Sequence, residues 1–362
     1  MRCKSFLLLM LCAALLALPV SAMQSDDLLA VLTDGDADAW VAQTLPSLAG
    51  DGGEWYAIAL AQNGKHYDFS EYAAALTAYF DAESIGSAVE RQRIALALLA
   101  VDADSDIPDR VLADSVGKQG TMSLVFGLHL LQNGANSGAH TVESVTAQLL
   151  ERQNADGGWC VAGTRSDADV TAMALQALAP QKETHADVIE RALFCLSAMQ
   201  KEDASFASYG VSNAESCCQV IVALTALGID PETDARFVKN GKTVLDALET
   251  FRLPDGSFAH VIGGKRNNFA CQQALLAYVA LERFAEGKSG LYAFDPKPTV
   301  PPETDDAQTS EQSETASSSL AERQESTDTP ANDGMPPFRM TVLILALVIG
   351  LASLVYLLIG KK

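Results

Sequence analysis

Two acidic residues, Asp167 and Asp169, open an apolar run that continues to Leu178. Carboxylates in the first turn of a helix accept hydrogen bonds from exposed backbone N–H groups and interact favourably with the positive end of the helix dipole. A carboxylic acid that is buried away from water can instead serve as a proton donor. We predict helix capping as the role of both residues, and Asp169 remains the one candidate for a catalytic acid.

Three cysteines form a second set of candidates. Cys217, Cys218 and Cys271 fall at equivalent positions of two apolar segments, and Glu215 lies close to the first two. Thiolates bind zinc together with carboxylates or imidazoles, for which His260 is the nearest histidine in sequence, and Cys217 and Cys271 are also candidates for a disulfide bond. We favour buried thiols that pack as small apolar groups, so that no metal or other resident cofactor is expected.

A third set of candidates emerges when six apolar segments are aligned on a shared alanine or glycine. The positions five before, two before and two after that residue lie on one face of a helix. The side chains there predict a ligand pocket lined by Trp55, Glu90, Arg93, His129, Asp169, Gln176, Thr225 and Gln272. A core filled by these same side chains is the alternative interpretation.

Two carboxylates across a pocket would also suit a glycosidase or lyase, and Glu90, Asp169 and Glu215 are the candidates for such a pair. Sites of that kind add several aromatic rings that stack on sugars. Trp55 is the only aromatic residue in the aligned stripe, so a carbohydrate-active enzyme stays a second alternative.

The elements that must position these residues form a repeat. The aligned apolar segments have almost no charged face, as expected of helices that are buried all round, and they occupy residues 56–64, 94–102, 126–134, 173–181, 222–230 and 276–284. Amphipathic stretches alternate with them, at about 36–47, 68–82, 106–116, 141–153, 185–200 and 239–251. This alternation predicts six helix hairpins, which either close into a double-walled ring or stack as an open solenoid.

The turns between these helices carry a family resemblance. The segment QNADGGW (153–159), with weaker copies QKEDASF (200–206) and FRLPDGSF (251–258), resembles the QW motif of squalene-hopene cyclases. Together with 167–180 and 213–231, these segments are similar to the terpenoid cyclase and protein prenyltransferase superfamily, and most of all to bacterial surface proteins with prenyltransferase and squalene-oxidase repeats. The resemblance implies an all-α fold, an (α/α)6 toroid, over residues 23–294.

The residues of the motif have structural roles in this interpretation. A glutamine at the end of an outer helix can bond exposed backbone groups, glycines permit the sharp reversal, and an aromatic ring packs over the junction. The residues concerned are Gln153, Gly157, Gly158, Trp159, Gln200, Phe206 and Phe258.

The resemblance also implies activities. DADVTA (167–172) is similar to the DxDDTA acid motif of squalene-hopene cyclases, in which Asp169 would match the proton donor, but Val170 replaces the acid that follows it. Protein prenyltransferases hold zinc with Asp, Cys and His. The toroidal domain of intrinsic factor and transcobalamin is a more distant likeness and implies a corrinoid ligand, although no β domain follows here.

The ends of the chain predict export and anchoring. Residues 1–22 resemble a signal peptide, with Arg2 and Lys4 before an apolar run and small residues at the cleavage site. The acidic, Pro/Ser/Thr-rich segment 295–337 is expected to be a disordered stalk, 338–360 a transmembrane helix, and 361–362 a cytoplasmic tail. These features predict a single-pass cell-membrane protein with an extracellular toroid.

Composition narrows the function further. The formal net charge of the 362 residues is -21, which argues against binding to nucleic acid. Only 7% of the residues are aromatic, so few rings are available to stabilise the carbocations that a cyclase forms. We therefore predict a non-catalytic binding module for a small organic ligand or a surface protein. An enzyme that uses Asp169 or a cysteine metal site is the alternative.

Overall fold

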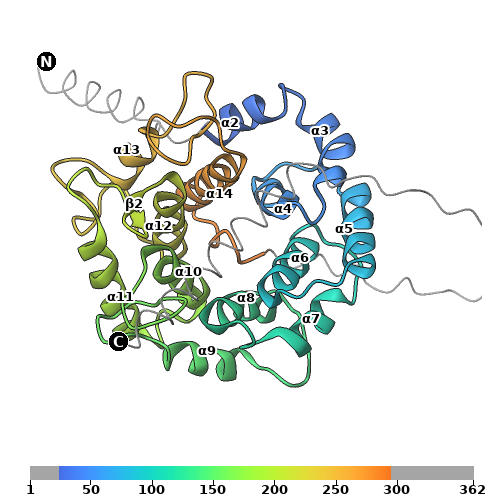
Figure 1. Cartoon of the computed structure of the whole chain (residues 1–362), viewed down its shortest axis with the longest axis horizontal. Coiled ribbons are helices and arrows are strands. Elements are labelled where there is room, and N and C mark those ends of the chain that lie inside the picture. The colour runs from blue at the N-terminus through green and yellow to red at the C-terminus, as the bar shows by residue number, and fades with distance from the viewer. Residues whose placement is uncertain (1–23, 295–362) are drawn as a thin grey trace, which may run out of the picture. The chain divides into compact units, whose positions relative to one another are not determined.

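A computed structural model describes residues 24–294, and these residues are almost entirely helical. Six helices form an inner ring: α4 (Gly53–Gln62), α6 (Ala88–Ala100), α8 (Gly120–Gln132), α10 (Ala168–Leu178), α12 (Ala214–Ala226) and α14 (Asn268–Ala285). Each contacts the next, and α14 also contacts α4, so the inner ring is closed (Figure 1). The predicted all-α class is confirmed for this part of the chain, and the ring closes instead of continuing as an open solenoid.

A second set of helices surrounds this ring. The outer helices are α3 (Ala37–Gln43), α5 (Ser70–Ala82), α7 (Ile107–Ser115), α9 (Val142–Leu150), α11 (Ala186–Met199) and α13 (Val244–Glu249). Short 3-10 helices follow α3 and α10, at η1 (Leu45–Leu48) and η2 (Ala179–Gln181). A further helix, α2 (Gln24–Leu32), precedes them all and packs against α14, which the repeat pattern did not predict.

Small side chains let the inner helices approach one another closely. Ala95 and Ala97 of α6 are fully buried, and most other residues of the inner ring are buried or nearly so. Gly127 of α8 has no room for a side chain, because an added Cβ would lie 2.9 Å from Cγ2 of Val116. The alanine-rich composition of these segments is therefore a packing requirement of the ring.

The turn before α10 shows how a hairpin is fixed. The Nε2 atom of Gln153 donates to the carbonyl oxygens of Gly157 and Val188, at 2.7 and 3.0 Å. The indole N–H of Trp159 donates to the carbonyl oxygen of Leu149 at 2.8 Å, and the ring is completely buried. The motif residues thus join the end of an outer helix to the turn and to the next outer helix.

Two further turns repeat this geometry. Gln200 donates to the carbonyl oxygen of Ala204 at 3.1 Å, and Arg252 donates to that of Gly256 at 3.2 Å. Arg252 thus takes the place of the glutamine in the third copy, and its guanidinium lies 4.7 Å from the ring centroid of Phe258. The aromatic residues of both copies, Phe206 and Phe258, are fully buried.

The outer helices are shorter than the sequence predicts. Helix α13 starts at Val244 instead of 239, because Lys239 and Lys242 pair across a turn in which Asn240 and Gly241 have positive φ angles of 53° and 73°. Thr243 then caps the helix. Turn chemistry therefore overrides the amphipathic pattern in this segment.

Several predictions concern residues outside the described part of the chain. These are the signal peptide 1–22, the stalk 295–337, the transmembrane helix 338–360 and the tail 361–362. Among the residues that are described, no helix has the length and apolar character needed to cross a membrane.

Candidate functional site

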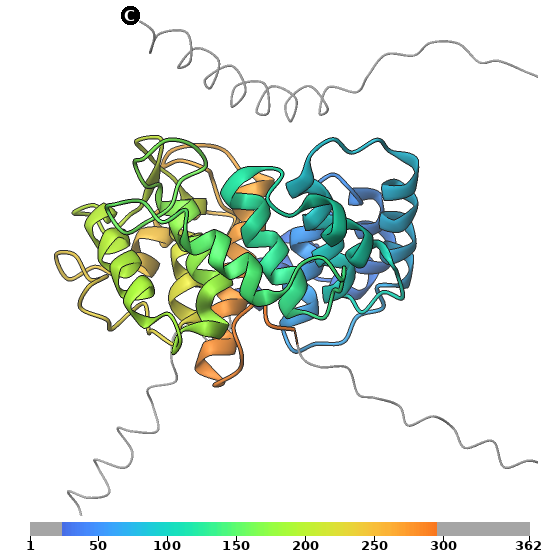
Figure 2. The ribbon, with the colours of Figure 1, turned by 90° about the horizontal axis from the view of Figure 1, so that it is seen from below.

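Three loops gather at the end of the ring where α10, α12 and α14 begin (Figure 2). The loop 160–167 precedes α10, a two-stranded hairpin of β1 (Ala207–Ser208) and β2 (Val211–Ser212) precedes α12, and the loop 259–267 precedes α14. The first two are joined by a hydrogen bond from Ser208 Oγ to Asp167 Oδ2 at 2.9 Å. The last two are joined by His260, whose carbonyl oxygen accepts from the N–H of Ala214. We call this edge the rim.

The rim exposes large apolar side chains. Six such side chains are exposed among residues 24–294, and five of them belong to the rim: Val161, Tyr209, Val211, Ile262 and Phe269. We call these five residues the rim cluster. Tyr209 is the most exposed, at 88%, and the sixth residue, Phe194, lies on the outer helix α11.

The backbone at Tyr209 is in an unusual conformation. Tyr209 and Gly210 are the two central residues of the β1–β2 hairpin, with φ angles of 50° and 85°. Two positive φ angles are typical of a type I′ turn, in which asparagine followed by glycine is strongly preferred. An aromatic residue is costly at the first of these positions, and strain of this kind concentrates at functional sites.

The acidic residues lie at the base of the rim. Asp167 is the N-cap of α10 and accepts from the N–H groups of Asp169 and Val170, at 3.0 and 3.2 Å. The capping prediction therefore holds for Asp167 and fails for Asp169, whose Oδ1 atom is buried without a hydrogen-bond partner among the described residues. The hydroxyl of Ser216 is in the same situation.

Burial raises the pKa of Asp169 to about 7, and the charges of Asp167 and Glu215 act in the same direction while the hydroxyls of Ser216 and Ser208 oppose them. Burial also raises the pKa of Glu215, although its Oε2 atom lies 2.8 Å from Nδ1 of His260. Two carboxylates and an imidazole thus meet where α10 and α12 begin.

The predicted stripe lies inside the ring, where most of its side chains contact residues that do not belong to the stripe. The rings of Trp55 and Phe126, from α4 and α8, lie 6.1 Å apart across the helix α6 that separates them in the ring. Arg93 pairs with the buried Glu54 at 3.3 Å. Gln272 donates to the carbonyl oxygen of Gly52 at 3.1 Å. The last two contacts join neighbouring parts of the ring, and the first joins α4 to α8.

A chain of amides continues the same pattern. Gln176 of α10 donates to the side chain of Gln219 of α12, which donates to Gln273 of α14. The hydroxyl of Thr225 donates a hydrogen bond to the carbonyl oxygen of Ile221 in the same helix, at 2.9 Å. Glu90 lies in the first turn of α6, where its N–H donates to the capping residue Ser87. Gln219 and Gln273 were missed because they fall one position away from the aligned stripe.

The last stripe residue, His129, lies at the other end of the ring. Residues 289–294, which we call the C-terminal strap, cross the ring where the inner helices end, and the ring of Tyr292 lies 4.8 Å from that of His129. Asn133 holds the strap by donating to the carbonyl oxygen of Tyr292 and accepting from the N–H of Phe294, both at 2.8 Å. Burial lowers the pKa of His129 to about 3, so its imidazole is neutral.

The cysteines are free thiols in the described residues. Cys217, Cys218 and Cys271 are buried, and Cys271 Sγ accepts from the N–H of Phe258 at 3.2 Å. Burial raises the pKa of Cys217 to about 12, which keeps the thiol protonated. Residues 24–294 contain no group of three or more metal-binding side chains, and the disulfide considered as an alternative for Cys217 and Cys271 is not formed.

Comparison with known proteins gives matches among solved structures alone. No family model matches the sequence, and no curated protein matches it. Among solved structures, the chain is similar to the ent-copalyl diphosphate synthase from Streptomyces platensis, with 18% identity and a TM-score of 0.44. The match covers 63% of this chain and 49% of that enzyme, so this chain corresponds to about half of its length. The similarity concerns the helical fold, and no activity is carried over from it.

Proposed function

We propose that the chain is a non-catalytic binding module that recognises a partner protein through the rim cluster. In this proposal the C-terminal segment 338–360 anchors the chain in a membrane, and the helical ring presents the rim outside the cell. The observation that carries the proposal is that five of the six exposed large apolar side chains among residues 24–294 lie on the three rim loops and the first turn of α14.

The energetics of the rim favour a protein surface as the partner. Burying an apolar side chain contributes roughly 25 cal/mol for each Å² removed from water. Tyrosine is enriched among the residues that contribute most to protein interfaces, because a rigid ring is buried at a small cost in conformational entropy. Tyr209 and Phe269 supply two such rings, and Ile262, Val161 and Val211 add further exposed apolar area to the rim. The closed helical ring holds the loops that carry them.

The interior of the ring gives less support to a small ligand. The stripe residues Trp55, Arg93, Gln176 and Gln272 contact other parts of the ring, and His129 lies under the strap. A corrinoid or another small organic molecule would have to break these contacts or bind on the rim itself. A cyclase would need a water-free aromatic cavity around Asp169, whereas the groups that act on its carboxyl are serines and carboxylates.

Site-specific photocrosslinking tests the proposal in the full-length chain. A photoreactive phenylalanine analogue is introduced at Ile262 in one variant and at Phe194 in another, and both are illuminated in cells that produce the chain. We expect a covalent adduct with a protein at position 262 and none at 194, which is equally exposed but lies on α11. Equal adducts at both positions, or none at either, would contradict the proposal.

A titration with cobalamin tests the alternative that the rim binds a corrinoid. We expect no binding at micromolar concentrations by absorbance or calorimetry. Binding that disappears in Tyr209→Asn would make a corrinoid the occupant of the rim in place of a protein.

A further inference from the structure

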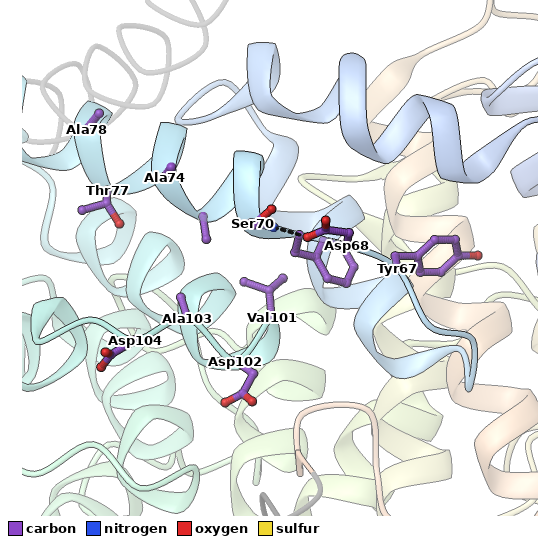
Figure 3. A pocket seen from close by; sticks show the side chains of 12 residues that line it. Tyr67, Asp68, Ser70, Ala74, Thr77, Ala78, Val101, Asp102, Ala103 and Asp104 are labelled. Carbon is purple, nitrogen blue, oxygen red and sulfur yellow. Dashed lines mark hydrogen bonds between the residues drawn. The ribbon is translucent and has the colours of Figure 1, made fainter.

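A groove of about 710 Å³ lies on the outer ring beside α5 (Figure 3). Helix α5 is in a different part of the ring from α10, α12 and α14, where the rim lies (Figure 1). One wall is α5, and the other is the turn that follows α6, residues 101–104. The helix presents small side chains to the groove, and aromatic residues stand at one end. The lining residues are Tyr67, Asp68, Phe69, Ser70, Ala73, Ala74, Thr77, Ala78, Val101, Asp102, Ala103 and Asp104.

The charge of the groove has one sign. Asp68, Asp102 and Asp104 belong to its lining, and none of the lining residues is a lysine, arginine or histidine. Figure 3 shows Asp68 beside Ser70 and the other two acids on the opposite wall. Hydrogen bonds from Ser70 lower the pKa of Asp68, so this carboxylate is charged at neutral pH. The groove therefore has a carboxylate just before α5 and two more on the opposite wall, beside the small side chains of α5.

The dimensions of the groove match a short extended peptide. The lining residues of α5 run from Ser70 to Ala78, which spans roughly 12 Å at a rise of about 1.5 Å per residue. An extended chain advances about 3.3 Å per residue, so about four residues cover this length. The volume lies within the usual range for binding sites, and small side chains such as Ala73 and Ala74 leave the floor low enough for a backbone to lie on it.

We propose that this groove binds a short extended segment of a partner protein that carries lysine or arginine at both ends and small apolar residues between them. The positive ends lie near the carboxylates of the two walls, and the apolar residues cover the alanines of α5. The net charge of -21 steers such a segment towards the chain. This inference is independent of the rim and stands if the rim has no partner.

The test uses a defined peptide as the probe. The full-length chain is titrated with the acetylated peptide Lys-Ala-Val-Ala-Lys at millimolar concentrations and followed by NMR or calorimetry. We expect weak binding that decreases with added salt, and no binding of Glu-Ala-Val-Ala-Glu. Two variants locate the site. Ala74→Trp fills the groove, and Asp104→Asn removes one carboxylate that lies outside any helix.

Matched controls lie on other outer helices. Ala113→Trp changes an exposed alanine of α7, and Asp187→Asn changes an exposed acid of α11. We expect Ala74→Trp to abolish binding, and Asp104→Asn to weaken it about 2- to 5-fold, as for an exposed ion pair, while neither control changes it. The proposal is overturned if the basic peptide does not bind, if Ala74→Trp binds as the unmodified chain does, or if spermidine binds as tightly as the peptide.

Discussion

The buried position of Asp169 at the start of α10 is unfavourable for a charged carboxylate. Its carboxylate has two acidic neighbours, and its Oδ1 atom has no hydrogen-bond partner among the described residues. Desolvation penalises the charged form of such a group, so the carboxyl binds its proton more tightly in the folded chain than in the unfolded one. An ionised Asp169 therefore lowers the stability of the ring, and it does so more as the pH rises.

The sign of this effect gives a pH-dependent prediction. The pKa of Asp169 rises from 3.8 to about 7 on folding, so the penalty is absent below about pH 4 and complete above about pH 7. Asp169→Asn removes the charge, and we expect it to unfold at a higher urea concentration than the unmodified chain at about pH 8. The difference in the free energy of unfolding should shrink by about 1.4 kcal/mol per pH unit between about pH 7 and about pH 4.

The matched control is Asp187→Asn, which changes an exposed acid in the first turn of α11. Its effect on the free energy of unfolding should vary little over the same pH range. A constant difference between Asp169→Asn and the unmodified chain at about pH 4 and about pH 8 would show that Asp169 is not the titrating group.

At the scale of helices and turns, the sequence predicts the architecture well. Six alanine-rich segments correspond to the six inner helices. Gln153 and Gln200 of the turn motif bond to backbone carbonyl groups, and the aromatic residues of the motif are buried. These features depend on local periodicity and on turns within one hairpin. Helix α2 and the strap were not predicted, because their places depend on contacts with α14 and with Asn133, which are distant in sequence.

The turn motif provides a prediction with an internal control. Gly157 and Gly163 have the same φ angle of 94°, but only Gly157 is enclosed, because an added Cβ would lie 2.6 Å from the carbonyl oxygen of Arg191. Gly163→Ala should cost about 1 kcal/mol of stability from the left-handed backbone alone. Gly157→Ala should cost about 3 kcal/mol, because it adds a steric clash in a packed turn.

Chemical unfolding of both variants measures the difference between them. Equal losses of stability would mean that the turn can move away from Arg191 without cost. The motif would then contribute less to the fold than its hydrogen bonds indicate.

At the scale of the whole molecule, the two ends of the ring differ. The strap crosses one end and is fixed by Asn133, while the other end carries the rim loops and their exposed side chains. The sequence did not predict the rim cluster, because apolar residues such as Ile262 and Val211 are normally read as core. Their exposure depends on where the ring places the loops. The one local signal was Tyr209-Gly210 between two short strands, which is typical of a hairpin turn.

In the proposed function, Tyr209 serves recognition at the expense of stability. Tyr209→Asn places a preferred residue in the type I′ turn and removes the exposed ring, so stability and binding should change in opposite directions. The decisive measurement compares Tyr209→Asn with the unmodified chain, each carrying the photocrosslinker at position 262. We expect the free energy of unfolding to rise by about 1 kcal/mol and the protein adduct to decrease by about tenfold or more. An undiminished protein adduct in the stabilised variant would contradict the proposed role of Tyr209 in recognition.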